Sequence, residues 1–199
     1  MIFYPLATDN FDRADNLDLG ANWTPTTGRS LQIVSNHVEP TLLATGDDES
    51  FTGRSWAVDH YSRANLTATG TMDLSGVGIS VRSQAPIRTY YDCVANKAAS
   101  NNISIGKEDS DNFTLLAQVT ETWSDGDEFT LAVSGAGILA YHGSTLIATA
   151  TDSALTTGEP GIRYSAVLTA GTIDNWEGGN FFLFDNISTN YKWPMIAGV

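Results

Sequence analysis

The chain has 199 residues, of which 42% are hydrophobic, so it is long enough to bury a sizeable core in one domain. Its formal net charge of −13 argues against nucleic acid and anionic membrane surfaces as partners, because both are bound through Lys and Arg. The first residues lack the basic region of a secretory signal, and no segment reaches the roughly 20 apolar residues of a membrane span, so we expect neither a signal peptide nor membrane insertion.

The first third of the chain is rich in turn-forming residues. The stretch 11–23 reads FDRADNLDLGANW, in which Asp, Asn and Gly favour turns while the apolar residues anchor a loop to the domain. Short strands are expected at 31–34 and 38–43, and Pro40 in the second is typical of an edge strand or a bulge. The run of carboxylates at 46–49 is expected to form an acidic turn.

The middle of the chain carries a clear strand pattern. In 76–83, Val77, Ile79 and Val81 alternate with small or polar residues, which is the period of a half-buried strand. The same spacing in 112–119 places four apolar residues on one face, namely Phe113, Leu115, Ala117 and Val119. Further strands are expected at 55–61, 63–69, 88–97 and 102–107.

The most informative stretch is 127–161, which reads DEFTLAVSGAGILAYHGSTLIATATDSALTTGEPG. Three short alternating segments are joined here by Gly-containing turns, which predicts an antiparallel meander. Further strands are expected at 161–167 and 171–176. The core residues predicted in the meander are Phe129, Leu131, Val133, Ile138, Ala140, Leu146 and Ala148.

Several segments together resemble a known family. These are FDRADNLDLGANW, GVGISVRS followed by TYYDCVAN, SIGKEDSDNFTLLAQV, the 127–161 stretch and TIDNWEGG. In this order they resemble the concanavalin A-like (laminin G-like) jelly roll over about residues 9–180. The resemblance implies an all-β, antiparallel two-sheet jelly-roll sandwich, which we place at 1–180. It indicates function only weakly, since the fold serves lectins, carbohydrate-binding modules, glycoside hydrolases, polysaccharide lyases and viral surface proteins.

The last segment, 181–199, reads FFLFDNISTNYKWPMIAGV and lies beyond the resemblance. Each of its large apolar side chains is worth on the order of 1.5–3 kcal/mol when buried, so we expect this C-terminal extension to pack. It forms either an end strand of the same sheet or a contact with a neighbouring subunit. The candidate assembly residues are Phe181, Phe182, Phe184, Trp193, Met195 and Ile196.

Catalysis is not expected from the sequence. Jelly-roll hydrolases of the resembled family carry a Glu-x-Asp-x-x-Glu strand, and none of the seven Glu residues here pairs with a carboxylate at that spacing. Cys93 has no activating partner nearby and is predicted to be a small core residue. A lyase built on Tyr and His with a neutralising Arg stays open through Tyr90, Tyr91, His60, His142 and Arg82.

Two kinds of binding site are predicted. A sugar requires an aromatic face and fixed polar groups, for which the candidates are Trp56, Arg82, Tyr90, Tyr91, Asn96 and His142. Trp and Tyr in sandwiches more often fill the core, so packing is the more common role for any one of these residues. Calcium prefers several oxygen ligands in a turn, and the carboxylates that could supply them are Asp9, Asp12 and Asp15. Members of the resembled family often hold calcium, and no other cofactor is expected.

The sequence thus predicts a non-enzymatic virion protein, such as a bacteriophage capsid decoration or tail-associated protein, which stabilises the shell or mediates adhesion. A sandwich of extracellular type without signal or disulfide suits a virion surface released by lysis. The expected partners are protein subunits of a larger assembly, including copies of the same chain. The alternative is a lectin-like carbohydrate-binding module for a cell-surface glycan, with or without calcium, and the third possibility is a polysaccharide hydrolase or lyase.

Overall fold

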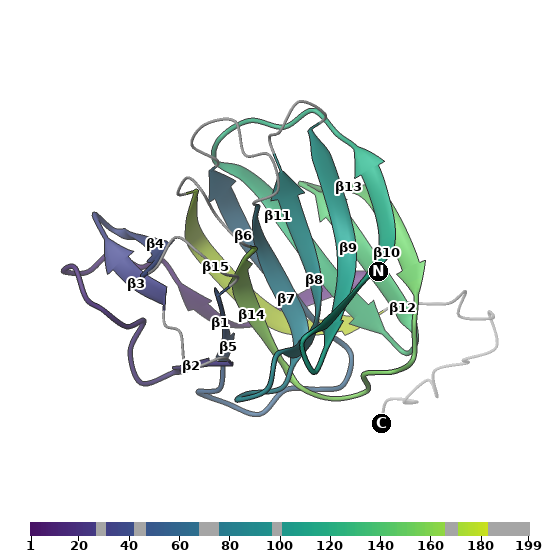
Figure 1. The fold of residues 1–199 in the computed structure, drawn as a ribbon, viewed down its shortest axis with the longest axis horizontal. Helices are drawn as coiled ribbons and strands as arrows, with labels where there is room; N and C mark the ends of the chain where they lie inside the picture. Colours follow the sequence, from purple (N-terminus) through teal and green to yellow (C-terminus); the bar gives the residue numbers. More distant parts are fainter. Residues whose placement is uncertain (27–30, 42–46, 68–75, 97–100, 166–170, 183–199) are drawn as a thin grey trace, which may run out of the picture.

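The computed structural model describes residues 1–26, 31–41, 47–67, 76–96, 101–165 and 171–182. Within these ranges the chain forms strands and no helix, and the strands make two antiparallel sheets that pack face to face (Figure 1). This confirms the predicted jelly-roll sandwich. None of the described residues forms a helix that could cross a membrane.

The first sheet has the order β13-β12-β11-β6-β15-β4-β3, and β1 also pairs with β15. Its strands are β1 (Ile2–Asp9), β3 (Leu31–Val34), β4 (His37–Pro40), β6 (His60–Thr67), β11 (Asp127–Ser134), β12 (Gly137–His142), β13 (Thr145–Thr151) and β15 (Thr172–Phe182). The second, seven-stranded sheet has the order β10-β9-β8-β7-β14-β5-β2. Its strands are β2 (Trp23–Pro25), β5 (Asp47–Phe51), β7 (Val77–Ser83), β8 (Thr89–Asn96), β9 (Asn102–Asp109), β10 (Asn112–Thr120) and β14 (Glu159–Tyr164).

The core lies between the two sheets and follows the predicted alternation. Val77, Ile79 and Val81 of β7 are fully buried there, as are Phe129, Leu131 and Val133 of β11 (these are the inward positions of each strand). Cys93 is also buried and has no disulfide, which confirms its predicted place in the core.

The acidic run 46–49 was expected to be a turn, and this prediction is wrong for its described part. Asp47–Phe51 forms β5, which is hydrogen-bonded to β14 on one side and to β2 on the other. A place inside the sheet satisfies the backbone on both sides, and this outweighs the poor strand propensity of Asp and Glu. The strand expected at 55–61 is shifted in the same region, because β6 begins only at His60.

Two bulges overturn the predicted alternation near one edge of the sandwich. In β13 the pairing with β12 shifts between Ala140 and Tyr141, so that Leu146 points outward and is 47% exposed, although it was predicted in the core. In β10 the pairing with β9 shifts between Leu115 and Ala117, which places these two residues on opposite faces. One extra residue in a strand reverses the face of every residue beyond it.

The two ends of the described chain lie side by side. β1 pairs with β15 from Ile2 opposite Phe182 to Asp9 opposite Trp176. Phe181 is buried, with its ring 5.1 Å from that of Phe3, so the sandwich continues past the predicted boundary at residue 180. The other candidate assembly residues, Phe184, Trp193, Met195 and Ile196, lie outside the described residues.

Candidate functional site

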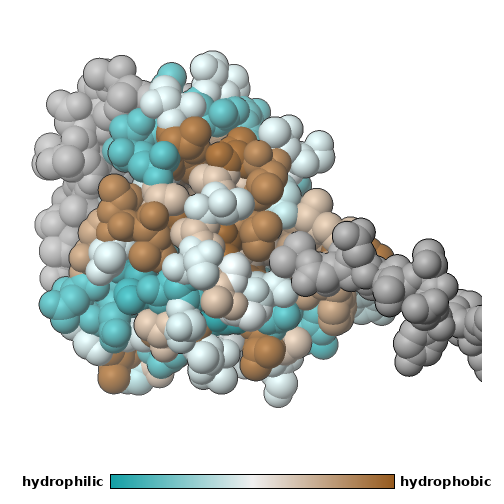
Figure 2. Space-filling view, turned by 90° about the vertical axis from the view of Figure 1, so that its right-hand side faces the viewer, coloured by the Kyte–Doolittle hydropathy of each residue, from teal (hydrophilic) through white to brown (hydrophobic). Residues whose placement is uncertain are grey.

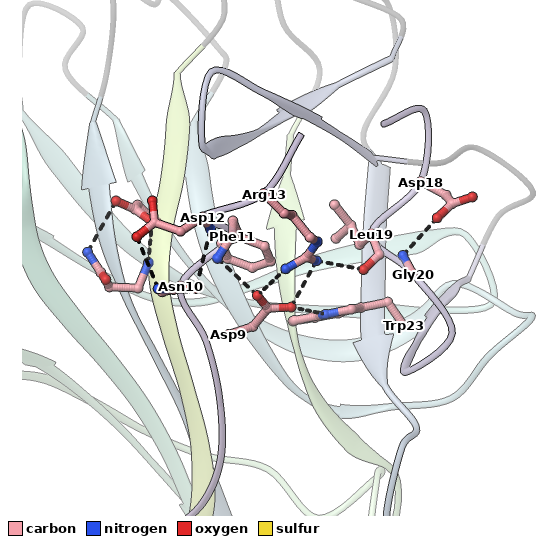
Figure 3. Close-up of polar contacts among 11 residues, drawn as sticks. Asp9, Asn10, Phe11, Asp12, Arg13, Asp18, Leu19, Gly20 and Trp23 are labelled. Carbon is pink, nitrogen blue, oxygen red and sulfur yellow. Dashed lines mark hydrogen bonds and ion pairs between the residues drawn. The ribbon is translucent and has the colours of Figure 1, made fainter. Parts of the chain in front are cut away.

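The carboxylate of Asp9, the first predicted calcium ligand, already binds groups of the protein itself (Figure 3). Its Oδ1 lies 2.6 Å from Arg13 Nη1, and its Oδ2 accepts a hydrogen bond from Trp23 Nε1 at 2.9 Å. Burial raises the pKa of Asp9, but the hydrogen bonds from Arg13 and Trp23 outweigh it and hold the pKa below its usual value. This carboxylate therefore ties the N-terminal loop to the domain.

Asp12 and Asp15 do not join Asp9 in one site. Asp12 Oδ2 accepts a hydrogen bond from Asn10 at 3.1 Å (Figure 3), whereas Asp15 Oδ1 accepts one from the backbone N–H of Ser35 at 2.8 Å. Among the residues that the structure describes, no three His, Cys, Asp or Glu side chains are placed to hold a metal ion. The described loop is thus held together by these separate contacts.

The predicted sugar ligands Tyr90, Tyr91 and Arg82 are buried. Tyr91 donates a hydrogen bond to Asp152 at 2.6 Å on the core side of β8, and Tyr90 lies on the opposite side of the strand. Arg82 donates to the carbonyl oxygen of Leu155 at 2.7 Å. Neither tyrosine ring has any exposed surface on which a sugar could stack.

The other three predicted sugar ligands are dispersed. Trp56 is half-buried, and its Nε1 donates to the carbonyl oxygen of Phe51 at 2.8 Å. The imidazole of His142 lies between Glu121, at 3.1 Å, and Asp127, at 3.0 Å. Only Asn96, which is half-exposed at the end of β8, belongs to the surface described next.

An apolar and polar surface lies on the outer face of the seven-stranded sheet at its β10 edge. We call it the β10 face and define it by its outward residues, which are Phe113, Leu115, Gln118 and Thr120 of β10, Ser104 of β9 and Asn96 of β8. Phe113 is 56% exposed and Leu115 51%. Figure 2 shows apolar side chains gathered on the side of the molecule that carries β10, β12 and β13.

Gly106 sits between the two exposed apolar residues and a buried carboxylate. A Cβ placed on Gly106 would lie 2.5 Å from Phe113 Cε2 and 2.4 Å from Asp92 Oδ1. The ring of Phe113 therefore leans over the glycine beside Asp92, and any side chain at position 106 would displace one of them. Because Gly106 has no side chain, Phe113 and Asp92 can both lie close to its backbone.

Beneath the β10 face lies a cluster of charged side chains and one tyrosine. Asp48, Tyr90, Asp92, Glu108 and Arg163 are buried in it, and Arg88 is half-buried at its margin. Arg163 Nε lies 2.7 Å from Asp92 Oδ2, and the Arg163 guanidinium covers the ring of Tyr90 at 4.8 Å. The N–H of Gly106 and the charge of Arg88 also act on Asp92 and lower its pKa, but the Arg163 ion pair is the short contact of this carboxylate.

Burial dominates the titration of this cluster. It raises the pKa of Asp92, and the carboxylate of Glu108 raises it further. It also raises the pKa of Asp48 to about 6 and lowers that of Arg163 to about 10. A buried carboxylate with unused oxygens is stabilised by any polar group that can donate to it.

No protein-family model and no curated protein matches the sequence, whereas many solved structures share the fold. The carbohydrate-binding module CBM66 from Bacillus subtilis is 12% identical, with a TM-score of 0.68 over 82% of this chain and 98% of the module. The exoplasmic/lumenal domain of VIP36, in a form bound to Ca2+ and Man3GlcNAc, is 12% identical, with a TM-score of 0.57 over 81% of this chain and 85% of the domain. A LamA variant from Z. galactanivorans, in complex with laminaritriose and laminaritetraose, is 10% identical, with a TM-score of 0.55 over 88% of this chain and 98% of LamA. At such identities these likenesses establish that the chain has the concanavalin A-like jelly-roll fold.

Proposed function

We propose that this chain is a lectin-like carbohydrate-binding module that holds a glycan on the β10 face. The observation that carries the proposal is the exposed pair Phe113 and Leu115, which shares its face with the half-exposed Ser104, the partner of Gln118. A pyranose offers an apolar face for the Phe113 ring and hydroxyl groups for the surrounding polar side chains. Gln118 and Asn96 supply further hydrogen-bond donors and acceptors on the same face.

The solved structures support this function over a virion role. CBM66 is named as a carbohydrate-binding module, and the VIP36 and LamA structures contain oligosaccharides. Fold likeness alone does not transfer a ligand, so the proposal depends on the chemistry of the β10 face. That face combines an exposed aromatic ring with polar side chains, which are the groups that sugar binding uses.

We further propose that the module does not cleave its ligand. Glycoside hydrolysis requires two carboxyl groups that flank the scissile bond, one of which donates a proton. Asp92 is buried against Arg163 at 2.7 Å, and Glu108 is also buried, so neither carboxyl group flanks a ligand seated on Phe113. Release of reducing or unsaturated ends from a polysaccharide panel would establish the hydrolase or lyase alternative instead.

A glycan array run with and without EDTA tests the proposed function. Reproducible binding that survives EDTA and is lost in Phe113→Ala would support recognition on the β10 face. Binding that EDTA abolishes would instead indicate a calcium site, for which Asp9, Asp12 and Asp15 are the sequence candidates.

Assembly on a virion remains a prediction from the sequence. Phe181 is buried in a small cluster with Tyr61 and Tyr141, apart from the core between the sheets, while Phe182 at the end of β15 is 47% exposed. A chain that lacks residues 183–199 tests this role through its oligomeric state and its binding to particles. Unchanged assembly of the shortened chain would exclude the extension as the assembly element.

A further inference from the structure

A second site is indicated by a pocket of about 300 Å³ at the β2 edge of the seven-stranded sheet. Its described lining residues are Asp18, Leu19, Gly20, Ala21, Trp23, Pro25 and Glu49. The volume is at the small end of the range for small-molecule sites. The pocket is separate from the β10 face, because β10 and β2 are the opposite edges of this sheet.

Glu49 is the buried polar group of the pocket, with only 2% of its surface exposed. Its Oε1 accepts a hydrogen bond from the backbone N–H of Leu31 at 2.7 Å. Within the described part of the chain, Oε2 makes no hydrogen bond and no Lys or Arg forms an ion pair with this carboxylate. One oxygen of Glu49 is therefore available to a ligand.

The surroundings of Glu49 are negative. Asp18 lies at the pocket lining, where its Oδ1 accepts a hydrogen bond from Gly20 at 2.8 Å (Figure 3), and Asp47 and Asp48 precede Glu49 in β5. Burial raises the pKa of Glu49 to about 8; the Leu31 N–H opposes the rise, and these three aspartates add to it. The nearest basic side chain of the loop, Arg13, binds Asp9 and the carbonyl oxygen of Leu19 instead.

The remaining walls are apolar and fixed. Leu19, Ala21 and Pro25 contribute aliphatic surface, and the orientation of the Trp23 indole is set by its hydrogen bond to Asp9. An indole is the side chain that attracts cations most strongly through its ring face. Apolar walls around an uncompensated carboxylate match a ligand that carries one positive charge on a hydrocarbon body.

We propose that this pocket binds a primary alkylammonium group, either of an aliphatic amine or of a lysine side chain, with the nitrogen against Glu49 and the carbon chain against Leu19 and Trp23. Calcium takes six to eight oxygen ligands, whereas the described lining offers two carboxylates. A neutral alcohol would leave the charge of Asp18 uncompensated and would give Glu49 no reason to release its proton. The proposal is independent of the proposed glycan site.

Binding is expected to release a proton. In the empty pocket at pH 7 most Glu49 side chains are protonated, because the pKa is about 8. A bound ammonium group favours the carboxylate form, so the proton leaves as the cation enters. The enthalpy of binding will then differ between buffers of different ionisation enthalpy.

Calorimetric titration of the full chain with n-butylammonium chloride at pH 7, in phosphate and in PIPES, tests the proposal. We expect saturable binding, no binding of 1-butanol, and at least about tenfold weaker binding by Glu49→Gln, which keeps the acceptor for Leu31 but carries no charge. Asp12→Asn removes one charge from the same loop outside the pocket and should bind as the wild type does.

Several outcomes would overturn the alkylammonium site. One is that 1-butanol binds as tightly as n-butylammonium, and another is that Glu49→Gln binds n-butylammonium with unchanged affinity. Complete displacement of n-butylammonium by calcium chloride would also exclude the site, as would the absence of saturable binding up to about 50 mM n-butylammonium. If Glu49→Gln does not fold, Asp18→Asn replaces it, with several-fold weaker binding expected. Phe113→Ala should retain the amine site, so failure of this proposal and failure of the glycan site are distinguishable.

Discussion

Arg163 Nε lies 2.7 Å from Asp92 Oδ2, although β7 separates the strands β14 and β8 that carry them. The outward residues of β7 beneath this contact are Gly78 and Ser80, which are small enough to let the arginine reach across the strand. Both charged side chains are buried. The ion pair therefore joins three strands of the seven-stranded sheet under the β10 face.

Arg163→Met is expected to lower the free energy of unfolding by about 3–5 kcal/mol, because it leaves Asp92 buried without a counter-charge. The double variant Arg163→Met/Asp92→Leu should recover much of this loss, since it removes both charges. Urea unfolding of the wild type and the two variants measures the difference. A single variant that loses less than about 1 kcal/mol would show that the pair is not desolvated as described.

Trp176→Ala should be strongly destabilising. The indole is buried, its ring lies 4.9 Å from Phe51 and 4.8 Å from Trp23, and its Nε1 donates to Ser62 Oγ at 2.9 Å. We expect a loss of about 3–5 kcal/mol in unfolding experiments. Trp56→Ala, at the half-buried edge of the same aromatic group, should cost clearly less, and equal losses would contradict the packing described.

His60 and His142 should titrate at clearly different pH values. Burial lowers the pKa of His60 to about 4, and its Nε2 accepts a hydrogen bond from the Arg82 backbone N–H at 3.0 Å, so it is neutral. Burial lowers the pKa of His142 too, but hydrogen bonds with Glu121 and Asp127 outweigh it and raise the pKa above 6.5. The stabilisation from His60 is thus lost as the pH falls from 6.5 towards 4, whereas that from His142 is lost as the pH rises through its folded pKa. Resolved imidazole signals in an NMR titration measure both, and a His60 signal that titrates near pH 6.5 would contradict its burial.

Glu49 should make the protein less stable as the pH rises. Its pKa is raised from 4.5 to about 8, so its contribution is present below pH 4.5 and is lost as the pH rises through about 8. Relative to Glu49→Gln, the wild type should lose about 3 kcal/mol between pH 5 and pH 8. Parallel urea curves for the two proteins across this window would show that Glu49 is not desolvated.

The sequence predicted correctly those strands whose alternation of inward and outward residues is uninterrupted and can be recognised within the strand itself. The alternation of Val77, Ile79 and Val81 marked β7 correctly because that strand is uninterrupted. It failed for Leu146 in β13, where a bulge decides the face of the strand, and it gave no indication that β1 pairs with β15. Such features depend on pairing between separate segments of the chain, which a local pattern does not contain.

The candidate site was only partly visible in the sequence. Asn96 belongs to the β10 face, whereas Tyr90 and Tyr91 are buried, and Phe113 was placed on the apolar face of its strand but not among the sugar ligands. The alternation of β8 could have located Asp92, because a strand that points Cys93 into the core points its neighbour Asp92 to the outer face. That Asp92 would meet Arg163 follows only from the strand order, which joins segments about 70 residues apart (163 against 92).

Calorimetry gives the most direct test of glycan recognition on the β10 face. A glycan that binds in the array is titrated into the wild type, Phe113→Ala and Leu146→Ala. Leu146 is a matched control, because it is exposed on the outer face of the other sheet. We expect Phe113→Ala to weaken binding at least about tenfold, or about 1.4 kcal/mol, while Leu146→Ala binds as the wild type does. Equal affinities of wild type and Phe113→Ala, with both proteins folded, would contradict glycan recognition on the β10 face.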